Sequence, residues 1–395
     1  MSNKKIAVIG VGTAGITNLA HLLAFLPKDW TVYSISDPSI PMLGIGESTS
    51  TSIPMSLHYG ADFSMTTDAD YLDATVKHGT KYVNWRPHEF NADIPLPSFG
   101  IHFNNFKLKE FSFNRFIKKF KERFVILEGN ISQIASTDTC ANATINGTSH
   151  EFDYIIDCGG YPTDYADYTL LDMPVNHCLV HTIKSPGDWN FTYHTAHANG
   201  WMFGIPLKTR QGWGYLYNDT ITAQEDAKIN LAETLGIEYQ DLNLREFSFK
   251  NYRANKFLDG RILKNGNRAL FYEPIEAMSG WFYDMVIRLF FDLVLFNQYS
   301  EEQLNYRLTA VADEYELAIH YLYHGGSTFD STFWKITSNK SKQRLQSSLK
   351  FKQHIDNLQK YKHVTEYPDA ALPFPASSWK MFDRQLNYHY FTSAE

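Results

Sequence analysis

A glycine-rich turn near the N-terminus constrains the fold of this chain more than any other feature. The apolar, β-branched run Ile6–Ile9 leads into the turn, and the helical stretch Ile16–Phe25 follows it and ends before Pro27. Between them the chain reads Gly10-Val-Gly12-Thr13-Ala14-Gly15, which has the G-x-G-x-x-G spacing. The sequence therefore predicts a strand, a tight turn and a helix that together bind a dinucleotide, and a coincidental glycine turn is the alternative.

Each glycine of this fingerprint has a physical role. Gly10 permits the tight turn, Gly12 lets the backbone approach a pyrophosphate, and Gly15 lets the helix pack closely. Thr13 and Ala14 lie in the same turn, and the N-terminus of the helix that follows faces the phosphates. We expect these five residues to bind the cofactor.

A carboxylate at the expected distance supports the same interpretation. A second predicted strand, Thr31–Ile35, is followed by Asp37, about 20 residues beyond the glycines, where a carboxylate binds the nucleotide ribose. On these residues alone, FAD and NAD fit equally well.

Composition excludes several other classes of protein. A chain of 395 residues can form two packed lobes or one elaborated domain, and its net charge of −7 argues against a nucleic-acid partner. The apolar stretch Met285–Phe296 contains Arg288 and is too short to span a bilayer, so we expect no membrane association. Three cysteines form neither a CxxC pair nor an even set. That pattern indicates a reducing, cytoplasmic location without a disulfide framework or a metal site.

The rest of the chain predicts further elements. A loop rich in Gly, Ser and Thr covers Pro41–Thr51, and helical character resumes at Ala69–Thr75. A strand at Asp153–Asp157 runs into Gly159-Gly160, short aromatic strands fill Leu179–Phe257, and helices follow from Glu273 to about Lys362. We expect a cofactor domain at residues 1–300 with a sheet inserted at about 165–260, and a helical substrate-covering region at 301–395.

Four stretches, in order along the chain, resemble the flavin-dependent halogenases, of which the tryptophan halogenases are the best-known branch. Gly44–Thr49 is similar to the flavin-gripping loop, and Ala74–Trp85 to the segment with the essential lysine. Gly200–Leu207 resembles the WxWxIP signature, and Phe271–Glu276 resembles the stretch that bears the active-site glutamate.

This resemblance implies a fold and a set of ligands. The fold is α/β, the FAD-binding, two-dinucleotide-domain (Rossmann-like) fold of flavoprotein monooxygenases, with an inserted β-sheet and a C-terminal helical lobe over the substrate. Reduced FAD comes from a separate flavin reductase, because the chain has no second fingerprint for a nicotinamide. Halide and an electron-rich aromatic small molecule are the co-substrates, as in secondary-metabolite biosynthesis. The implied cofactor residues also include Gly46, Glu47, Ser48, Thr49 and Asp157.

Lys77 and Glu276 are the implied catalytic residues. An ammonium in an apolar pocket can donate a hydrogen bond to hypohalous acid, and the free amine can form a haloamine. A carboxylate near the arene can stabilise the cationic intermediate and accept its proton. A surface lysine and a surface glutamate are the structural alternatives, and Glu273 is the substitute if the alignment is shifted.

Two further groups of residues are implied to line a halide site or a tunnel. Trp201, Phe203 and Pro206 match the aromatic signature, although Phe203 replaces its second tryptophan, and core aromatics are the alternative. Met278, Ser279 and Gly280 fall in the halide segment, where Ala277–Gly280 replaces the Ser-Thr-Gly of the family and is one residue longer.

Three functions therefore compete. The first is an FAD-dependent halogenase, and the second is an FAD-dependent aromatic monooxygenase that hydroxylates its substrate. The third is a catalytically silent flavin-binding protein. A homodimer is the default oligomeric state.

Overall fold

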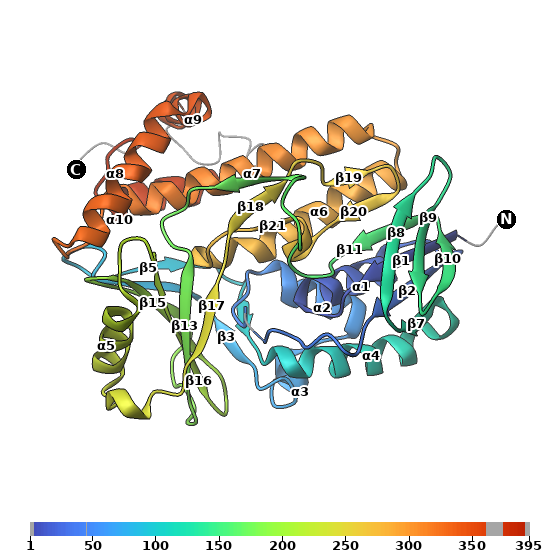
Figure 1. Cartoon of the computed structure of the whole chain (residues 1–395), viewed down its shortest axis with the longest axis horizontal. Helices are drawn as coiled ribbons and strands as arrows, with labels where there is room; N and C mark the ends of the chain where they lie inside the picture. The colour runs from blue at the N-terminus through green and yellow to red at the C-terminus, as the bar shows by residue number, and fades with distance from the viewer. Residues whose placement is uncertain (1–3, 45, 361–373, 392–395) are drawn as a thin grey trace. The chain divides into compact units, whose positions relative to one another are not determined.

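The strands predicted around the glycine turn belong to one largely parallel sheet (Figure 1). The computed structural model describes residues 4–44, 46–360 and 374–391. They form two compact units. Unit 1 holds the chain up to Val76 together with Ser98–Leu171 and Tyr252–Thr309, and unit 2 holds Lys77–Pro97, Asp172–Asn251 and the chain from Ala310 onward.

The six-stranded sheet of unit 1 has the order β19-β20-β11-β1-β2-β7. Ile9 of β1 lies opposite Ile35 of β2 on one side and Asp157 of β11 on the other, and both pairings are parallel. The last four residues of β1 are buried, as expected for a parallel sheet covered on both faces. The carboxyl ends of β1, β2 and β11 therefore share the sheet edge where dinucleotides bind.

The two faces of this sheet are covered by different layers. Ala7, Ile9 and Ile35 form a core cluster with Ala143 and Phe152 of the three-stranded sheet β10-β9-β8. Helix α1 begins directly after Gly12 and contacts α2, α4 and α6. The strands of unit 1 are β1 (Lys4–Ile9), β2 (Trp30–Ser36), β6 (Gly100–His102), β7 (Phe124–Glu128), β8 (Ile131–Ser136), β9 (Ala141–Ile145), β10 (Thr148–Phe152), β11 (Tyr154–Asp157), β12 (Tyr168–Leu171), β19 (Leu258–Asp259), β20 (Ile262–Lys264) and β21 (Leu270–Phe271). Its helices are α1 (Thr13–Phe25), α2 (Ser52–Ala61), α3 (Met65–Asp68), α4 (Asn105–Phe120) and α6 (Met278–Val294), with 3-10 turns η1 (Lys121–Arg123), η3 (Gly266–Arg268) and η4 (Ile275–Ala277).

Unit 2 is built on a seven-stranded sheet of order β17-β13-β16-β15-β14-β4-β5. Its strands are β4 (Gly79–Val83), β5 (Phe90–Asp93), β13 (His177–Ile183), β14 (Phe191–His197), β15 (Gly200–Pro206), β16 (Gln211–Tyr217) and β17 (Arg245–Ser248). Its helices are α5 (Gln224–Leu235), α8 (Thr332–Ser347), α9 (Leu349–Lys360) and α10 (Ala376–Gln385), with the 3-10 turn η2 (Tyr239–Asp241). Strands β3 (Thr75–Lys77) and β18 (Asn251–Ala254) and helix α7 (Glu301–Tyr323) cross the unit boundaries.

The register assigns the residues of this sheet to two faces. Residues directly opposite each other in an antiparallel pair point to the same face. His194 pairs with Phe203 and Phe203 pairs with Gly214, so these residues share one face. Leu179, Met202 and Tyr215 occupy the other face, where they form a core cluster with Leu231 of α5.

The structure departs from the sequence-based elements at two places. The stretch Ala69–Thr75 is not helical: α3 ends at Asp68, Asp73 has a left-handed backbone (φ 55°), and β3 begins at Thr75. The middle of the chain contains helix α5, where we expected only strands and turns. The helices after Glu273 are confirmed as far as Lys360. The domain division at residue 300 stays a proposal beside the two observed units.

Candidate active site

The glycine fingerprint adopts the tight geometry that its spacing predicts. Gly10 has φ +96°, and a Cβ atom there would lie 2.5 Å from the carbonyl oxygen of Cys158. A Cβ on Gly15 would lie 2.0 Å from the carbonyl oxygen of Gly10, whereas one on Gly12 would meet nothing within 4 Å. Gly12 is also the N-cap of α1 and, as a glycine, has no side chain that could cap the helix. The backbone at Gly12 is therefore open to a ligand, and the helix N-terminus favours an anionic one.

Two variants separate these roles. We expect Gly15→Ala to destabilise unit 1, because the new methyl group clashes with backbone. Gly12→Ala should leave the thermal unfolding midpoint unchanged and weaken FAD binding at least about tenfold, because the methyl group fills the space of the pyrophosphate. Differential scanning fluorimetry and a flavin titration measure the two effects. Tight FAD binding by Gly12→Ala would contradict the assigned position of the pyrophosphate.

The two predicted carboxylates lie at the carboxyl ends of β2 and β11, the two strands that flank β1. Asp37 follows β2 and accepts hydrogen bonds from the hydroxyl and the backbone N–H of Ser39, and these bonds hold its pKa below the ordinary value. Asp157 ends β11, accepts a hydrogen bond from the Gly159 N–H (2.8 Å) and lies 3.2 Å from Nε of Arg268. Both positions fit residues that contact a dinucleotide at this sheet edge.

The loop after Gly44 is fastened to β6. Thr49 exchanges hydrogen bonds with the backbone of Ile101 through its hydroxyl, at 2.9 Å in both directions. Glu47 is buried, and its carboxylate accepts a hydrogen bond from the Asn105 N–H (3.4 Å). Ser48 forms a β-bridge with His102. Gly46 has φ +82° and space beside it, so the loop presents open backbone at this residue.

A polar network around α1 was not predicted from the sequence. The side chain of Asn265 is fully buried and donates to Asn18 of α1 (3.0 Å) and to the backbone of Tyr283 in α6 (3.1 Å). Its backbone N–H donates to the carbonyl oxygen of Asp157 (2.9 Å). The available signal in the sequence was that Asn265 is a polar residue between β20 and a glycine. Chain order alone, however, does not place Asn265 beside the fingerprint.

The predicted glutamate lies in a strained turn of unit 1. Glu276 (φ 60°) and Ala277 (φ 50°) adopt consecutive left-handed conformations, which non-glycine residues rarely do. Helix α6 then begins at Met278, and Gly280 in its first turn packs against Ser50 and Ile53. Such strain persists where the surroundings enforce it and is concentrated at functional sites. The alternative residue, Glu273, is buried, whereas Glu276 is half-buried.

Lys77 lies in unit 2 and is buried, so the surface-lysine alternative is wrong. Lys77 is the last residue of β3. The sequence had indicated a helix directly before it, and that prediction is wrong. Burial, and secondly the positive charge of Lys77, hold the pKa of His194 well below its ordinary value. His194 therefore presents a neutral imidazole, and its ring centroid lies 4.7 Å from that of Trp201.

The aromatic signature occupies β15 of the same unit. Trp201 is fully buried and donates a hydrogen bond from Nε1 to the hydroxyl of Tyr323 in α7 (2.5 Å). Phe203 is half-buried and packs so closely on Gly214 that a Cβ there would lie 2.2 Å from its ring. Pro206 ends the strand beside Gly187. The structure thus brings Lys77, Trp201 and Phe203 into one unit, and Glu276, Met278, Ser279 and Gly280 into the other.

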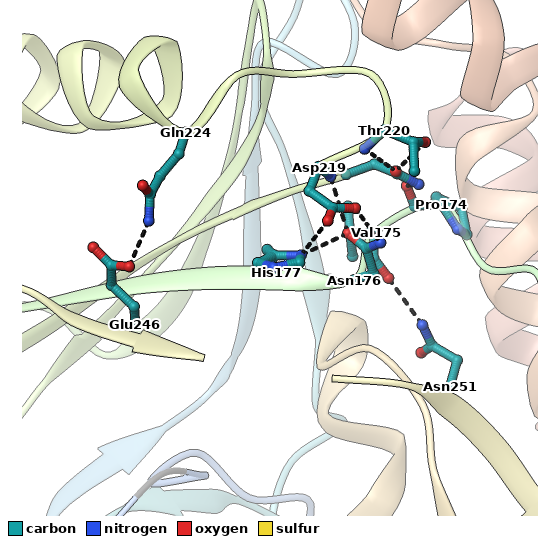
Figure 2. Close-up of polar contacts among 10 residues, drawn as sticks. Pro174, Val175, Asn176, His177, Asp219, Thr220, Gln224, Glu246 and Asn251 are labelled. Carbon is teal, nitrogen blue, oxygen red and sulfur yellow. Dashed lines mark hydrogen bonds and ion pairs between the residues drawn. The ribbon is translucent and has the colours of Figure 1, made fainter. Parts of the chain in front are cut away.

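A surface pocket of about 430 Å³ in unit 2 contains none of the predicted site residues. It is lined by His177, Leu179, Tyr217 and Glu246 among others, on the face of the sheet that carries α5. Figure 2 shows that its polar groups are paired: Asn176 donates to Asp219 (2.7 Å), and Nδ1 of His177 lies 3.0 Å from Oδ1 of Asn176. His194 and Phe203 lie on the opposite face, so we place the candidate chemistry there.

Residues 4–44, 46–360 and 374–391 contain neither a metal-binding cluster nor a membrane-spanning helix. Within these ranges no group of three His, Cys, Asp or Glu side chains is arranged to hold a metal ion. No helix in the same part of the chain is long and apolar enough to cross a membrane.

The parallel sheet and the glycine fingerprint together define a protein with a dinucleotide-binding, Rossmann-like fold. A model of the tryptophan halogenase family matches residues 5–125 and 105–382. The chain therefore belongs to the tryptophan halogenase family and is an FAD-dependent oxidoreductase of the halogenase class. The halogenase resemblance and the fold class predicted from the sequence are both confirmed.

Individual relatives have low sequence identity to this chain, but the matches cover most of its length. Tryptophan 7-halogenase KtzQ of Kutzneria sp. (strain 744) is 22% identical over 362 residues, which cover 71% of this chain and 67% of the relative. Tryptophan 7-halogenase RebH of Lentzea aerocolonigenes is 23% identical over 394 residues, which cover 78% and 73%. The structure of a tryptophan halogenase from Shewanella frigidimarina superimposes with a TM-score of 0.81 at 17% identity, covering 99% of this chain and 89% of that one.

Proposed function

We propose that this enzyme halogenates an electron-rich aromatic or heteroaromatic small molecule of the indole or phenol type. The family match over most of the chain carries the proposal, and the burial of Lys77 supports it. When bound, reduced FAD supplies, with dioxygen, the two-electron oxidation of a halide to hypohalous acid. The protein then has to direct a reactive electrophile and keep water and other nucleophiles away from it.

Lys77 is the residue that we assign to the electrophile. Hypohalous acid needs a hydrogen-bond donor to become more electrophilic, or an amine that carries the halogen as a haloamine with release of water. A buried lysine can provide either group, because its surroundings decide the protonation state of the amine. His194 cannot take this role as an acid, since burial, and secondly the charge of Lys77, lower the pKa of its imidazole and keep it neutral.

Glu276 is assigned to the arene. Attack of the electrophile on the ring creates a cationic intermediate, and loss of one ring proton restores aromaticity. A carboxylate stabilises the cation and accepts that proton. The strained backbone at Glu276 and Ala277 supports this assignment, because a turn of that conformation fixes the direction of the side chain.

We infer the source of reduced FAD and the halide site from the resemblance to the family. A separate flavin reductase supplies reduced FAD, and halide binds near Met278, Ser279 and Gly280 at the start of α6. Since this segment departs from Ser-Thr-Gly, we propose a preference for bromide or iodide, which are easier to oxidise than chloride. The cytoplasmic location and the homodimer stay predictions.

The experiment supplies the pure protein with reduced FAD, air and one halide at a time, together with a panel of indoles and phenols. Mass spectrometry of the products is expected to show halogenated arenes, with bromide or iodide giving more product than chloride. Oxygenated products formed without halide would instead identify an aromatic monooxygenase. Flavin binding without any product over the whole panel would indicate the catalytically silent protein.

A further inference from the structure

Arg268 lies at the dinucleotide edge of the sheet, although no sequence motif indicates it. It ends the 3-10 turn η3, and the first residue of that turn, Gly266, packs on the fingerprint helix: a Cβ there would lie 2.7 Å from Cβ of Ala14. Nε of Arg268 is 3.2 Å from Oδ2 of Asp157, and Nη2 donates to the carbonyl oxygen of Gly159 (3.2 Å). All of these residues belong to unit 1.

The guanidinium of Arg268 is held by contacts with the protein and has further N–H donors that can bind a ligand. An arginine carries five N–H donors, and Nη2 donates one of them to the carbonyl oxygen of Gly159. Nε is buried and forms an ion pair with Asp157 at 3.2 Å, but donates no hydrogen bond to a described residue. The side chain of Tyr168 is a further hydrogen-bonding neighbour of the guanidinium. The side chain is 24% exposed, so a ligand can reach it. Asp157 and Gly159 thus anchor the guanidinium while part of it faces outward.

Without Arg268, the positive charge in this region is smaller than the negative charge of a pyrophosphate. The N-terminus of α1 contributes a partial positive charge of roughly half a unit, whereas the pyrophosphate of FAD carries two negative charges. Lys264 is close enough for its charge to interact with Arg268 and Asp157, but burial lowers its pKa and its ammonium lies over the ring of Tyr168. A fork-shaped, permanently charged guanidinium is the group that matches phosphate oxygens best.

We propose that Arg268 binds the pyrophosphate of FAD through its guanidinium, and that Asp157 is the positioning residue that orients it. This inference rests on FAD being the bound dinucleotide, and it does not depend on halogenation. It explains why Arg268 is held at the end of β11, where Asp157 pairs with Ile9 of the fingerprint strand.

The test is a titration of the full-length, flavin-free protein with oxidised FAD, followed by flavin fluorescence. Arg268→Gln is expected to weaken FAD binding roughly 10- to 100-fold, because one or two charge-assisted hydrogen bonds are lost. It should also flatten the dependence of affinity on salt concentration. Arg268→Lys keeps the charge but not the fork, and should fall between the wild type and Arg268→Gln.

Arg261→Gln is the matched control, because Arg261 belongs to the same unit but stacks on Tyr154 away from the fingerprint. It should bind FAD as the wild type does. Equal FAD affinity in the wild type, Arg268→Gln and Arg268→Lys would overturn the proposal. Thermal unfolding of each variant separates lost binding from lost folding, and the lysine variant keeps the test valid if the glutamine variant is unfolded. A failed halogenation assay with intact FAD binding would count against the proposed function alone.

Discussion

Replacing Lys77 with alanine is expected to reduce halogenation about 10³-fold or more, while air still oxidises reduced FAD. The reason is that the variant removes the only group that we assign to the electrophile, and leaves the fingerprint and Asp37 unchanged. Product masses and oxygen consumption, measured in the same reaction, give both quantities. Lys81→Ala is the matched control, since Lys81 lies on the next strand, is partly exposed and pairs with Glu89 at 2.7 Å.

The distribution of products tells more than the rate. If Lys77→Ala still halogenates the arenes at the wild-type rate, freely diffusing hypohalous acid is the reagent and Lys77 has no part in the reaction. If the halogenated product disappears and an oxygenated one takes its place, the protein retains a monooxygenase activity that the lysine diverts. Lys77→Arg, which keeps a donor but forms no simple haloamine, separates the hydrogen-bonding route from the covalent one.

Acid is expected to unfold unit 2 well before it affects the carboxylates. Burial is the main cause that lowers the pKa of His197 and His324 to about 4 and that of His320 to about 3. A histidine in the unfolded chain has a pKa near 6.5. Below that pH the unfolded chain therefore binds protons that the folded chain, with its buried neutral histidines, does not bind. Stability is therefore lost as the pH falls from about 6.5 towards 4. At pH 5 the loss is roughly 2 kcal/mol for each histidine.

The three losses together approach the whole stability of an ordinary domain. We expect the thermal unfolding midpoint, followed by circular dichroism, to fall steeply between pH 6.5 and pH 5. His320→Gln should flatten this dependence, because a glutamine cannot take up the proton. His88→Gln, at an exposed position, should leave it unchanged. An unfolding midpoint that does not vary between pH 7 and pH 5 would show that these imidazoles are not neutral and buried in solution.

The sequence predicted the order of the first elements of unit 1, although α1 and β1 begin earlier than expected, at Thr13 and Lys4. Strand, glycine turn and helix carry their own local signals, because a buried parallel strand is apolar throughout and only glycine tolerates the contacts at Gly10 and Gly15. Helix α5 was missed because few apolar residues face inward: only Ala227, Leu231 and Ala232 are buried. The stretch before Lys77 looked helical because the left-handed turn at Asp73 leaves no trace in local composition.

The residues of the candidate site also fall into two groups, those that the sequence predicted and those that only the structure revealed. Lys77, Glu276 and the aromatic signature were found through a family pattern, and the structure adds their burial and backbone strain. Asn265 and Arg268 were not found, because they act through residues more than 100 positions away in the chain. Long-range polar contacts of this kind follow from the fold and not from any spacing in the sequence.

The buried tryptophans of unit 2 have a consequence for the durability of the enzyme. An indole is itself an electron-rich arene, so a protein that handles hypohalous acid contains potential targets for its own reagent. Trp85, Trp201 and Trp334 are buried, and each donates its indole N–H to a partner within the unit. Within the described ranges, Trp281 of α6 is the one exposed tryptophan, at 41%. Self-inactivation over many turnovers should therefore first appear as a halogen adduct on Trp281.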